Sequence, residues 1–460
     1  MTRIILFPRS LKDSLKYKLR RLLMYNKIKS FFEGKKVVIL GYGREGISTL
    51  KLISDMGCKS ITIADKNKDV KNQIENAERY NFCLGEDYLS CLDDCDIIMK
   101  APGIGLKNTV SDEIKKKITS QTDIFLQTCE SKIIGITGTK GKSTTSSLIY
   151  HILKESGRDT MLIGNIGVPP LERMKDFKSD TVIVCEMSCH QLEYVKASPD
   201  ISVLLNIYPE HLDHYEDFDA YANAKLNIFK FQKENDTLII GDEVKEKADT
   251  KADIIVAGFG CGNIGTRDNG IFINNEFISA DRIDTRLKGE HNLYNISIAF
   301  CAAIEAGCTI EECLAALPSF AGLPHRLEFV GVVNGAEYIN DSISTAPQTA
   351  IAALKAYPDT DTLIIGGMDR GISYDELAEF LNGKTSVRNL IILPDSGKRA
   401  AKDVINPDIE KLYADDMAMA VEIAKQVTRI RCILSPAAAS YGFYKNFEER
   451  GSHFKALLGF

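Results

Sequence analysis

The sequence predicts an α/β protein with more than one domain, and three observations support this prediction. Several apolar, β-branched runs stop at glycine-rich or polar turns and lead into stretches whose apolar residues have helical spacing, a pattern typical of parallel sheets covered by helices. A chain of 460 residues is too long for one hydrophobic core, so we expect two to four domains. The fractions of hydrophobic residues, 44%, and charged residues, 26%, are ordinary for a globular protein.

Composition also argues against several classes of protein. The net charge of −6 is unfavourable for a general nucleic-acid binder. No uncharged apolar run approaches the roughly 18–20 residues of a membrane span, and the apolar residues 4–7 are too few for a signal peptide. The 12 cysteines are scattered without a Cys-x-x-Cys pair, so we expect reduced, buried thiols in a cytoplasmic protein.

The first 33 residues form a basic extension ahead of the first strand. They are rich in lysine and arginine, and Asp13 is the single acid between Thr2 and Ser30. One helical face carries Leu11, Leu15, Leu19, Leu22 and Leu23. A basic amphipathic helix of this kind binds either an anionic membrane surface or the next domain or a partner subunit, and we favour the second alternative.

The next unit resembles a dinucleotide-binding one. A buried strand at residues 36–40 leads into Gly41-Tyr42-Gly43-Arg44-Glu45-Gly46, and Asp65 closes a second strand that we expect at residues 60–64. An NAD-dependent dehydrogenase is one hypothesis. The fingerprint itself requires only a diphosphate at a helix N-terminus and a carboxylate near a sugar, so a UDP-sugar fits it equally well.

The strongest single signal is the run Gly135-Ile136-Thr137-Gly138-Thr139-Lys140-Gly141-Lys142-Ser143-Thr144. An apolar strand precedes it and helical spacing follows, so the glycine loop and the helix N-terminus form a cradle for phosphate. Lys142 adds a positive charge, and the Ser143 hydroxyl is a ligand for magnesium. The glycine spacing departs from the strict nucleotide-binding loop, and a simple glycine hinge is the alternative that we consider weaker.

Two further strands end at polar residues. The run 181–185 stops at Glu186, where a carboxylate can hold magnesium beside a triphosphate. The run 201–206 leads to a polar cluster at residues 210–215, which is either a metal site or a solvated loop; for His214 we favour the loop. Lys225 lies in a helical stretch, and a surface position is the default for such a lysine.

Six ordered motifs resemble the Mur ligases over residues 34–460. They are the phosphate loop, the Glu186 strand end, Glu210-His211-Leu212-Asp213-His214, Gly289-Glu290-His291-Asn292-Leu293-Tyr294-Asn295, Leu323-Pro324-His325-Arg326, and Leu434-Ser435-Pro436-Ala437-Ala438-Ala439-Ser440 followed by residues 445–451. The last motif is similar to the family member that adds D-glutamate to UDP-N-acetylmuramoyl-L-alanine.

The resemblance implies three domains and an ATP-driven ligation in peptidoglycan synthesis. We expect a Rossmann-like UDP-sugar domain at residues 34–128, a central P-loop ATPase domain at 129–325 and a Rossmann-like amino-acid domain at 326–460. In the implied reaction, ATP converts a carboxylate to an acyl phosphate, the amine of glutamate attacks it, and phosphate leaves. Because two anions must meet, cations have to neutralise them.

The resemblance also assigns roles in ATP and metal binding. The residues implied for ATP are Gly138, Thr139, Lys140, Gly141, Lys142, Ser143, Thr144, Asn292, Asn295, Arg326 and Asp341. Two magnesium ions are implied, with Ser143, Glu186, His211 and Lys225 as ligands. Lys225 would be carbamylated for this purpose, which reverses the surface default. Lys142, Lys225, His211, Arg326 and His325 are the implied catalytic residues.

The substrate residues follow from the same resemblance. Arg44, Glu45, Asp65, Lys66 and Asn165 match positions near the UDP-muramoyl substrate, and Thr345, Arg370, Ser440 and Phe447 match positions that hold the glutamate carboxylates. Ile343, Ala346 and Arg370 depart from the usual family residues. An arginine still grips a carboxylate. The D- or L-configuration of the amino acid is less secure, and an L-glutamate-adding enzyme is the nearest alternative.

Two other classes stay open at this point. The dehydrogenase hypothesis gives no role to Lys142, Glu186 or Arg326, and a catalytically silent binding module would be expected to have lost Lys142 or Lys225. We expect a monomer that binds no nucleic acid.

Overall fold

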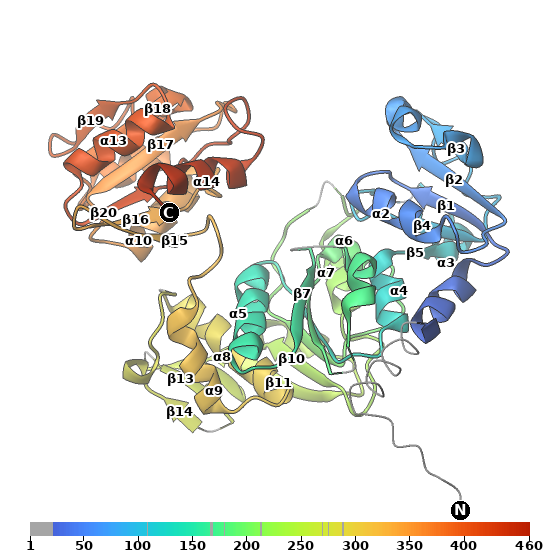
Figure 1. The fold of residues 1–460 in the computed structure, drawn as a ribbon. Helices are drawn as coiled ribbons and strands as arrows, with labels where there is room; N and C mark the ends of the chain where they lie inside the picture. Colours follow the sequence, from blue (N-terminus) through green and yellow to red (C-terminus); the bar gives the residue numbers. More distant parts are fainter. Residues whose placement is uncertain are drawn as a thin grey trace, which may run out of the picture. The chain divides into compact units, whose positions relative to one another are not determined.

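The computed structural model describes residues 22–460 except 108, 166–168, 179, 212–213, 269, 275, 288 and the side chains of 174 and 175. The strands form three sheets (Figure 1). The chain divides into two compact units, Met1–Asp284 with Glu290–Leu317, and Thr285–Gly289 with Pro318–Phe460. The sheets are mostly parallel, which confirms the predicted α/β class.

The first sheet has the strand order β3-β2-β1-β4-β5, and its pairings are parallel. Because β1 lies between β2 and β4, the carboxyl ends of β1 and β4 flank a switch point of the strand order, where α/β sheets bind ligands. Its elements are β1 (Lys36–Leu40), α2 (Arg44–Ile53), β2 (Ser60–Asp65), η1 (Lys68–Gln73), η2 (Ala77–Arg79), β3 (Asn81–Leu84), β4 (Ile97–Lys100), α3 (Asp112–Lys117), β5 (Ile118–Thr119) and α4 (Gln121–Thr128).

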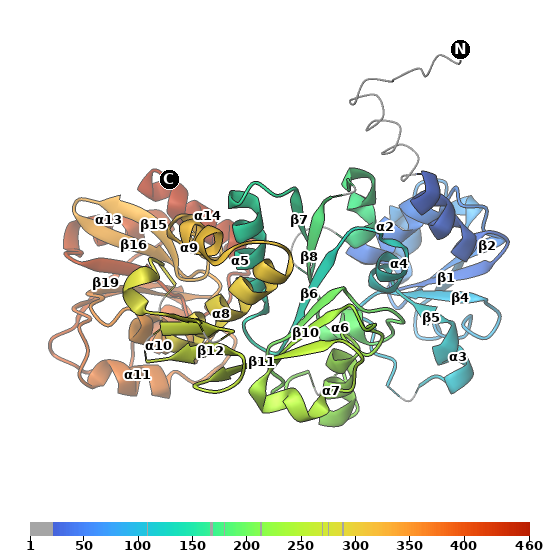
Figure 2. The ribbon, with the colours of Figure 1, turned by 90° about the horizontal axis from the view of Figure 1, so that it is seen from below.

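The second sheet has nine strands in the order β14-β13-β12-β11-β10-β9-β6-β8-β7 (Figure 2). β6 lies between β9 and β8, parallel to both. The pairings β12–β13 and β13–β14, at one end of the sheet, are antiparallel. Its strands are β6 (Ile133–Thr137), β7 (Thr160–Gly164), β8 (Val182–Glu186), β9 (Ile201–Leu204), β10 (Thr237–Gly241), β11 (Asp253–Phe259), β12 (Ile264–Arg267), β13 (Gly270–Ile273) and β14 (Glu276–Ile278).

Several helices that accompany this sheet begin after residues that are favourable at a helix N-cap. Ser188 caps α6 in a capping box with Gln191, and Asp217 caps α7. α5 packs against α8, β7 and β8. The helices are α5 (Lys142–Glu155), η3 (Pro170–Asp176), α6 (Cys189–Leu192), α7 (Phe218–Leu226), η4 (Asp242–Lys247), η5 (Ala280–Arg282), α8 (Glu290–Glu305), α9 (Ile310–Ala316) and η6 (Leu317–Ser319).

The third sheet belongs to the second unit and has the order β15-β16-β20-β17-β18-β19. All of its pairings are parallel except β15 with β16, and hydrophobic clusters cover both faces. Its elements are β15 (Glu328–Val333), β16 (Ala336–Asn340), α10 (Pro347–Ala356), β17 (Thr362–Gly367), α11 (Asp375–Asn382), β18 (Asn389–Asp395), α12 (Ser396–Ala400), β19 (Glu410–Tyr413), α13 (Met417–Val427), β20 (Arg431–Leu434) and α14 (Phe447–Leu458).

The first two sheets share one hydrophobic core. Ile39 of β1, Phe125 of α4 and Ile183 of β8 belong to the same buried cluster, so both sheets fall within the first unit. Residues 22–32 are helical, and Ile28 and Phe32 join this core. Most of the predicted basic extension, residues 1–21, lies outside the described residues. Among the described helices, none is long and apolar enough to cross a membrane.

Candidate active site

The predicted phosphate loop is a strand–loop–helix unit. It leaves β6 at Thr137 and enters α5 at Lys142, and Gly141 is the N-cap residue. Gly138 and Gly141 have φ angles of 157° and 86°, and a Cβ on Gly141 would lie 2.8 Å from Asn295 Oδ1. Glycine is therefore required at position 141 both for the backbone conformation and for the approach of α8.

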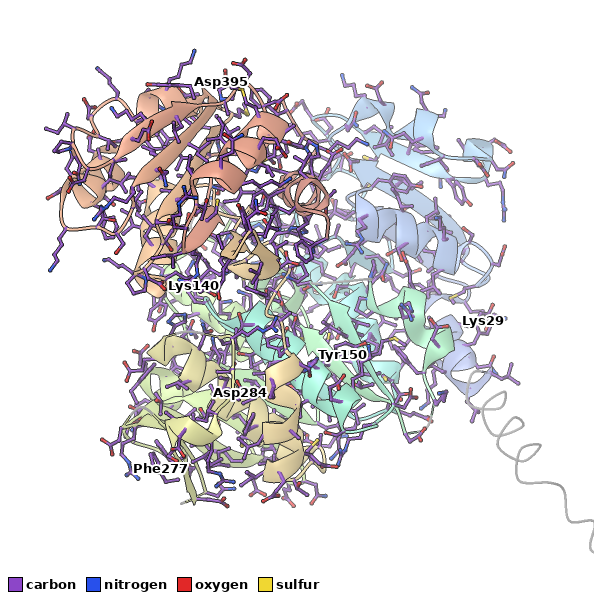
Figure 3. All side chains as sticks on the ribbon, turned by 60° about the vertical axis from the view of Figure 1, so that its left-hand side comes forward. Lys29, Lys140, Tyr150, Phe277, Asp284 and Asp395 are labelled. Atoms are coloured by element: carbon purple, nitrogen blue, oxygen red, sulfur yellow. The ribbon has the colours of Figure 1, made fainter. Side chains whose placement is uncertain are left out.

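The ammonium group of Lys142 folds back over this loop. Lys142 Nζ donates to Gly138 O at 2.8 Å and to Thr139 O at 3.0 Å, and burial lowers the pKa of Lys142. Lys140, labelled in Figure 3, is exposed and pairs with Glu210 at 2.6 Å. Ser143 and Thr144 lie in the first turn of α5. The loop thus presents cations and the positive end of a helix together, as a phosphate site requires.

Asn206, just beyond β9, holds the loop in shape. Its Oδ1 accepts from the backbone N–H of Thr139 at 3.0 Å and of Lys140 at 2.9 Å, and its Nδ2 donates to Lys140 O at 3.2 Å. Asn206 was not among the predicted site residues, although its position at the end of the apolar run 201–206 is a usable signal.

Glu186 ends β8 as predicted and is fully buried. Its Oε1 accepts from Asn165 Nδ2 at 2.7 Å, and its Oε2 accepts from Ser146 Oγ at 3.4 Å. Ser146 lies one turn after Ser143 in α5, so the carboxylate faces the start of the helix. Asn165, a predicted substrate residue, therefore lies beside the predicted metal ligand.

Lys225 is buried in α7, with 2% of its surface exposed. Its Nζ donates to Gly138 O at 2.8 Å and lies 5.0 Å from the ring centroid of Tyr221, and burial lowers the pKa of Lys225 to about 8. The default surface position is therefore wrong for this lysine. Because Lys142 donates to the same carbonyl oxygen, the two lysines converge on the phosphate loop.

The two asparagines predicted for ATP lie on α8, next to the loop. Asn295 Oδ1 accepts from Thr145 Oγ1 at 3.4 Å, and Asn295 Nδ2 donates to Asn292 Oδ1 at 3.3 Å. The packing of α8 on α5 thus brings residues that are about 150 positions apart to one side of the glycine loop.

His211 belongs to a cluster of aromatic rings. Its ring centroid lies 4.9 Å from that of His190 and 6.2 Å from that of Tyr221, which connects it with Lys225. His214 is only 10% exposed and lies 4.2 Å from His190, so the prediction of a solvated loop is wrong for His214. Among the described residues, no three His, Cys, Asp or Glu side chains form a ready metal site.

The predicted UDP-sugar residues lie around the ends of β1 and β2. Asp65 Oδ2 accepts from the N–H of Tyr42 at 2.7 Å, so the carboxylate supports the glycine turn. Glu45 Oε1 accepts from Gln191 Nε2 of the second sheet at 3.2 Å, and burial raises the pKa of Glu45. Arg44 is exposed, and Lys66 forms an exposed ion pair with Glu86 at 3.5 Å.

His325, Arg326 and Asp341 lie in the second unit. His325 has a φ of 63°, its Nδ1 lies 3.0 Å from Asn340 Nδ2, and burial lowers its pKa. Asp341 accepts from Ser435 Oγ at 2.8 Å, and burial raises its pKa to about 7. Arg326 is exposed, with no ion-pair partner among the described residues, and its charge opposes the rise in the Asp341 pKa.

Three of the four predicted amino-acid residues, Thr345, Arg370 and Ser440, occupy loops that follow strands of the third sheet. Thr345 and Arg370 are exposed, Ser440 is buried, and Phe447 begins α14 with its ring 6.2 Å from His325. Arg450 of α14 connects two of these loops.

Arg450 is 2% exposed, and its hydrogen bonds to the described residues all go to neutral groups. Its guanidinium donates to Ser342 O at 2.8 Å, to Ala438 O at 3.0 Å and to Ala439 O at 3.2 Å. Arg450 lies in the motif at residues 445–451 but was not a predicted site residue, because nothing in the local sequence distinguishes a buried arginine from a surface one.

Comparisons with known proteins agree with this arrangement. The Mur ligase middle domain matches residues 136–303, which contain the phosphate loop, Glu186, Lys225 and Asn295. Two curated relatives, both named UDP-N-acetylmuramoylalanine--D-glutamate ligase, come from Clostridium botulinum (strain 657 / Type Ba4) and Clostridium tetani (strain Massachusetts / E88). Each is 33% identical to this chain over 94% of this chain and 98% of its own length.

Solved structures share the fold at low sequence identity. The MurF ligase of Thermotoga maritima in complex with ADP has a TM-score of 0.55 and 18% identity, covering 94% of this chain and 96% of its own. The UDP-N-acetylmuramate-alanine ligase MurC of Thermotoga maritima has a TM-score of 0.53 and 15% identity, covering 91% and 98%. With its ordered motifs and relatives aligned over nearly the whole length, the chain belongs to the Mur ligase family.

Proposed function

We propose that this chain is an ADP-forming ligase that adds D-glutamate to UDP-N-acetylmuramoyl-L-alanine in peptidoglycan synthesis. The observation that carries the proposal is the 33% identity to relatives of this name over almost the full length of both chains. The phosphate loop with its two converging lysines gives the proposal a chemical basis. Family membership replaces the dehydrogenase interpretation of the first glycine fingerprint.

The proposed reaction activates a carboxylate by phosphorylation. A carboxylate is a poor acyl donor, and bringing it to the γ-phosphate of ATP places two anions in contact. Lys142 and the amides of the loop would bind the phosphates, and Arg326 would stabilise the charge on the transferring phosphoryl group. Asn292, Asn295 and Asp341 would orient the nucleotide, and Arg370 would bind a carboxylate of the amino acid.

The donor set fits magnesium that arrives with ATP. Mg²⁺ in phosphoryl-transfer sites takes one or two carboxylates and completes its shell with phosphate oxygens and water, so a ready cluster of protein ligands is not needed. Glu186 and Ser143 at the loop and His211 nearby would hold two such ions. When bound, magnesium neutralises phosphate charge.

Carbamylation of Lys225 is part of the proposal. The reaction is R–NH₂ + CO₂ → R–NH–COO⁻ + H⁺, so it requires the neutral amine. A pKa of about 8 leaves roughly a tenth of Lys225 neutral at pH 7, whereas an ordinary lysine is neutral in fewer than about one molecule in a thousand. Incubation with ¹³C-bicarbonate should give a carbamate carbonyl signal in the NMR spectrum that is absent from Lys225→Met.

The test of the function is ATP-dependent phosphate release with UDP-N-acetylmuramoyl-L-alanine and one of four acceptors: D-glutamate, L-glutamate, L-lysine or glycine. Turnover with D-glutamate alone, with the product mass confirmed, supports the proposal. Turnover with L-glutamate would keep the mechanism but change the substrate. Ile343 and Ala346, which differ from the usual family residues near Thr345, would then be the first candidates for the altered specificity. Silence with all four acceptors contradicts the proposal. A monomer in the cytoplasm remains our expectation.

A further inference from the structure

Lys100 is a buried cation with no role in the site described so far. It ends β4, at the switch point of the first sheet, and is 4% exposed. Its Nζ lies 3.0 Å from Glu193 Oε2 and 5.4 Å from the ring centroid of Tyr194, both of which belong to the second sheet's half of the unit. A buried charge is costly unless it is paired, so this contact fixes the two halves relative to each other.

The same carboxylate oxygen also contacts a histidine. Glu193 Oε2 lies 3.5 Å from His214 Nε2, and the Glu193 side chain is 17% exposed. On its other side, His214 meets the loop that follows β4, where a Cβ on Gly105 would lie 3.2 Å from His214 Nδ1. His214 is therefore confined between Glu193 and the loop that begins at Lys100.

From His214 the contacts lead to His211 through His190. The ring of His190 lies 4.2 Å from that of His214 and 4.9 Å from that of His211, and it stacks on Tyr215 with an interplanar angle of 4°. These are the offset and edge geometries that aromatic rings prefer. The carbonyl of His211 accepts from the N–H of His214 at 3.0 Å and of Tyr215 at 3.1 Å, which closes a tight turn.

That turn has an unfavourable backbone conformation. His211 has a φ of 57°, a left-handed conformation that is unfavourable for a residue with a Cβ. Such a residue persists only where its surroundings hold it. The surroundings here are the stacked rings, with one carboxylate beside each of two histidines. Glu193, which Lys100 holds, lies 3.5 Å from His214, and the more exposed Glu210 lies 3.9 Å from His211.

We propose that Lys100 is a positioning residue, which holds the turn at His211 in place through Glu193 and His214. This inference rests on the proposed function insofar as His211 is a magnesium ligand there. Lys100 stands at the end of a strand in the sheet assigned to the UDP-sugar, so the contacts connect that sheet with the proposed magnesium site. Neither sheet alone contains the whole set of contacts.

The first test needs no ligand and no activity. In Lys100→Met, hydrogen exchange at the amides of His214 and Tyr215 should accelerate about tenfold, which corresponds to a decrease of about 1.4 kcal/mol in the free energy of local opening. Lys100→Arg, which can keep the ion pair, should stay within about twofold of the wild type. Lys116→Met removes an exposed lysine that pairs with Glu113 on α3, between β4 and β5 of the same sheet, and it should leave the exchange rates unchanged.

A double variant separates positioning from general destabilisation. Lys100→Met leaves the Glu193 carboxylate without its cation, so the melting temperature should fall. Lys100→Met/Glu193→Gln removes both charges and should recover much of the melting temperature, yet exchange at His214 and Tyr215 should stay fast, because the anchor of His214 is gone. If exchange recovered together with stability, the proposal would be wrong.

Kinetics then distinguish positioning from direct substrate binding. For Lys100→Met we expect the magnesium concentration for half-maximal turnover to rise about tenfold, with the KM for the UDP-sugar substrate within about twofold of the wild type. A raised KM for the UDP-sugar with unchanged exchange would mean that Lys100 binds substrate, which overturns the inference. If the wild type showed no ligase activity, the proposed function would fail while the exchange test would still decide the role of Lys100.

Discussion

Replacement of Lys225 by methionine should abolish turnover and at the same time stabilise the unmodified first unit. Lys225 is almost fully buried, and its one hydrogen bond in the structure goes to Gly138 O, which Lys142 also contacts. Methionine has nearly the same length and no charge, so it keeps the packing and removes the desolvated cation. Gly138 O keeps Lys142 as its donor.

The magnitude follows from the pKa of Lys225. Burial lowers this pKa from 10.5 to about 8, which corresponds to a destabilisation of about 3 kcal/mol by the charged lysine, at 1.36 kcal/mol for each pKa unit. Loss of the hydrogen bond and of the contact with the Tyr221 ring offsets about 1 kcal/mol. The net stabilisation by Lys225→Met is therefore about 2 kcal/mol near pH 7.

The sign of the pH dependence is fixed by the direction of the pKa change. The folded chain releases its proton near pH 8, whereas the unfolded chain keeps it until about pH 10.5. The unfolded chain thus binds more protons in this window, and wild-type stability rises with pH there. The advantage of Lys225→Met is complete below pH 8 and shrinks toward zero at pH 10.5.

Scanning calorimetry in buffer free of CO₂ measures the effect. At pH 7 the transition of the first unit should rise by about 4 °C in Lys225→Met, and at pH 10 the two proteins should nearly coincide. Lys140→Met, which removes an exposed partner of Glu210, should shift the transition by less than about 2 °C at either pH. A lowered transition temperature at pH 7, or an equal gain at both pH values, would refute the reasoning.

Three further predictions concern single positions. Gly141→Ala should raise the KM for ATP about tenfold in initial-rate measurements, because the positive φ and the approach of Asn295 leave no room for a Cβ; an unchanged KM would contradict the assigned loop. Gly451→Ala should lower the free energy of unfolding by about 1–3 kcal/mol in denaturant titrations and reduce kcat, because its Cβ would overlap the His325 ring; wild-type kcat would show that the ring position is unimportant. Asp341→Asn should remove a loss of stability that the wild type shows as the pH rises from about 4 to 7. Burial raises the pKa of Asp341 to about 7, so in this pH range the folded chain binds a proton that the unfolded chain has released. Denaturant unfolding at several pH values tests this; an equal pH dependence in both proteins would contradict it.

Local patterns predicted the parts of the site that are local. The strand predicted at 36–40 matches β1, Glu186 ends β8, and the phosphate loop joins β6 to α5. In each case an apolar β-branched run and a glycine or polar residue lie next to each other in the sequence, so the period of the pattern and its interruption are both visible.

Local sequence patterns could not predict contacts between segments that are far apart in the chain. Asn206 lies 66 or more positions from the loop that it supports, and Lys100 lies 93 positions from Glu193. His214 looks polar in the sequence, but its burial depends on Glu193 and on the loop after β4. The resemblance to the Mur ligases corrected the default for Lys225, whose burial depends on how α7 packs on the sheet and not on its neighbours in the chain.

Asn206 has a consequence for selectivity. Its amide oxygen already accepts hydrogen bonds from the N–H groups of Thr139 and Lys140, so an anion that binds these groups exchanges one acceptor for another. The gain is then only the difference between a charge-assisted and a neutral hydrogen bond, about 1 kcal/mol for each. Orthophosphate or sulfate must displace the Asn206 amide oxygen and therefore gains little binding free energy at these two N–H groups. A triphosphate also contacts Lys142 and the helix N-terminus, so we expect it to bind more tightly. Asn206 therefore sets a minimum affinity for the loop, because an anion binds there only if its interactions are stronger than the hydrogen bonds of the Asn206 side chain that it replaces.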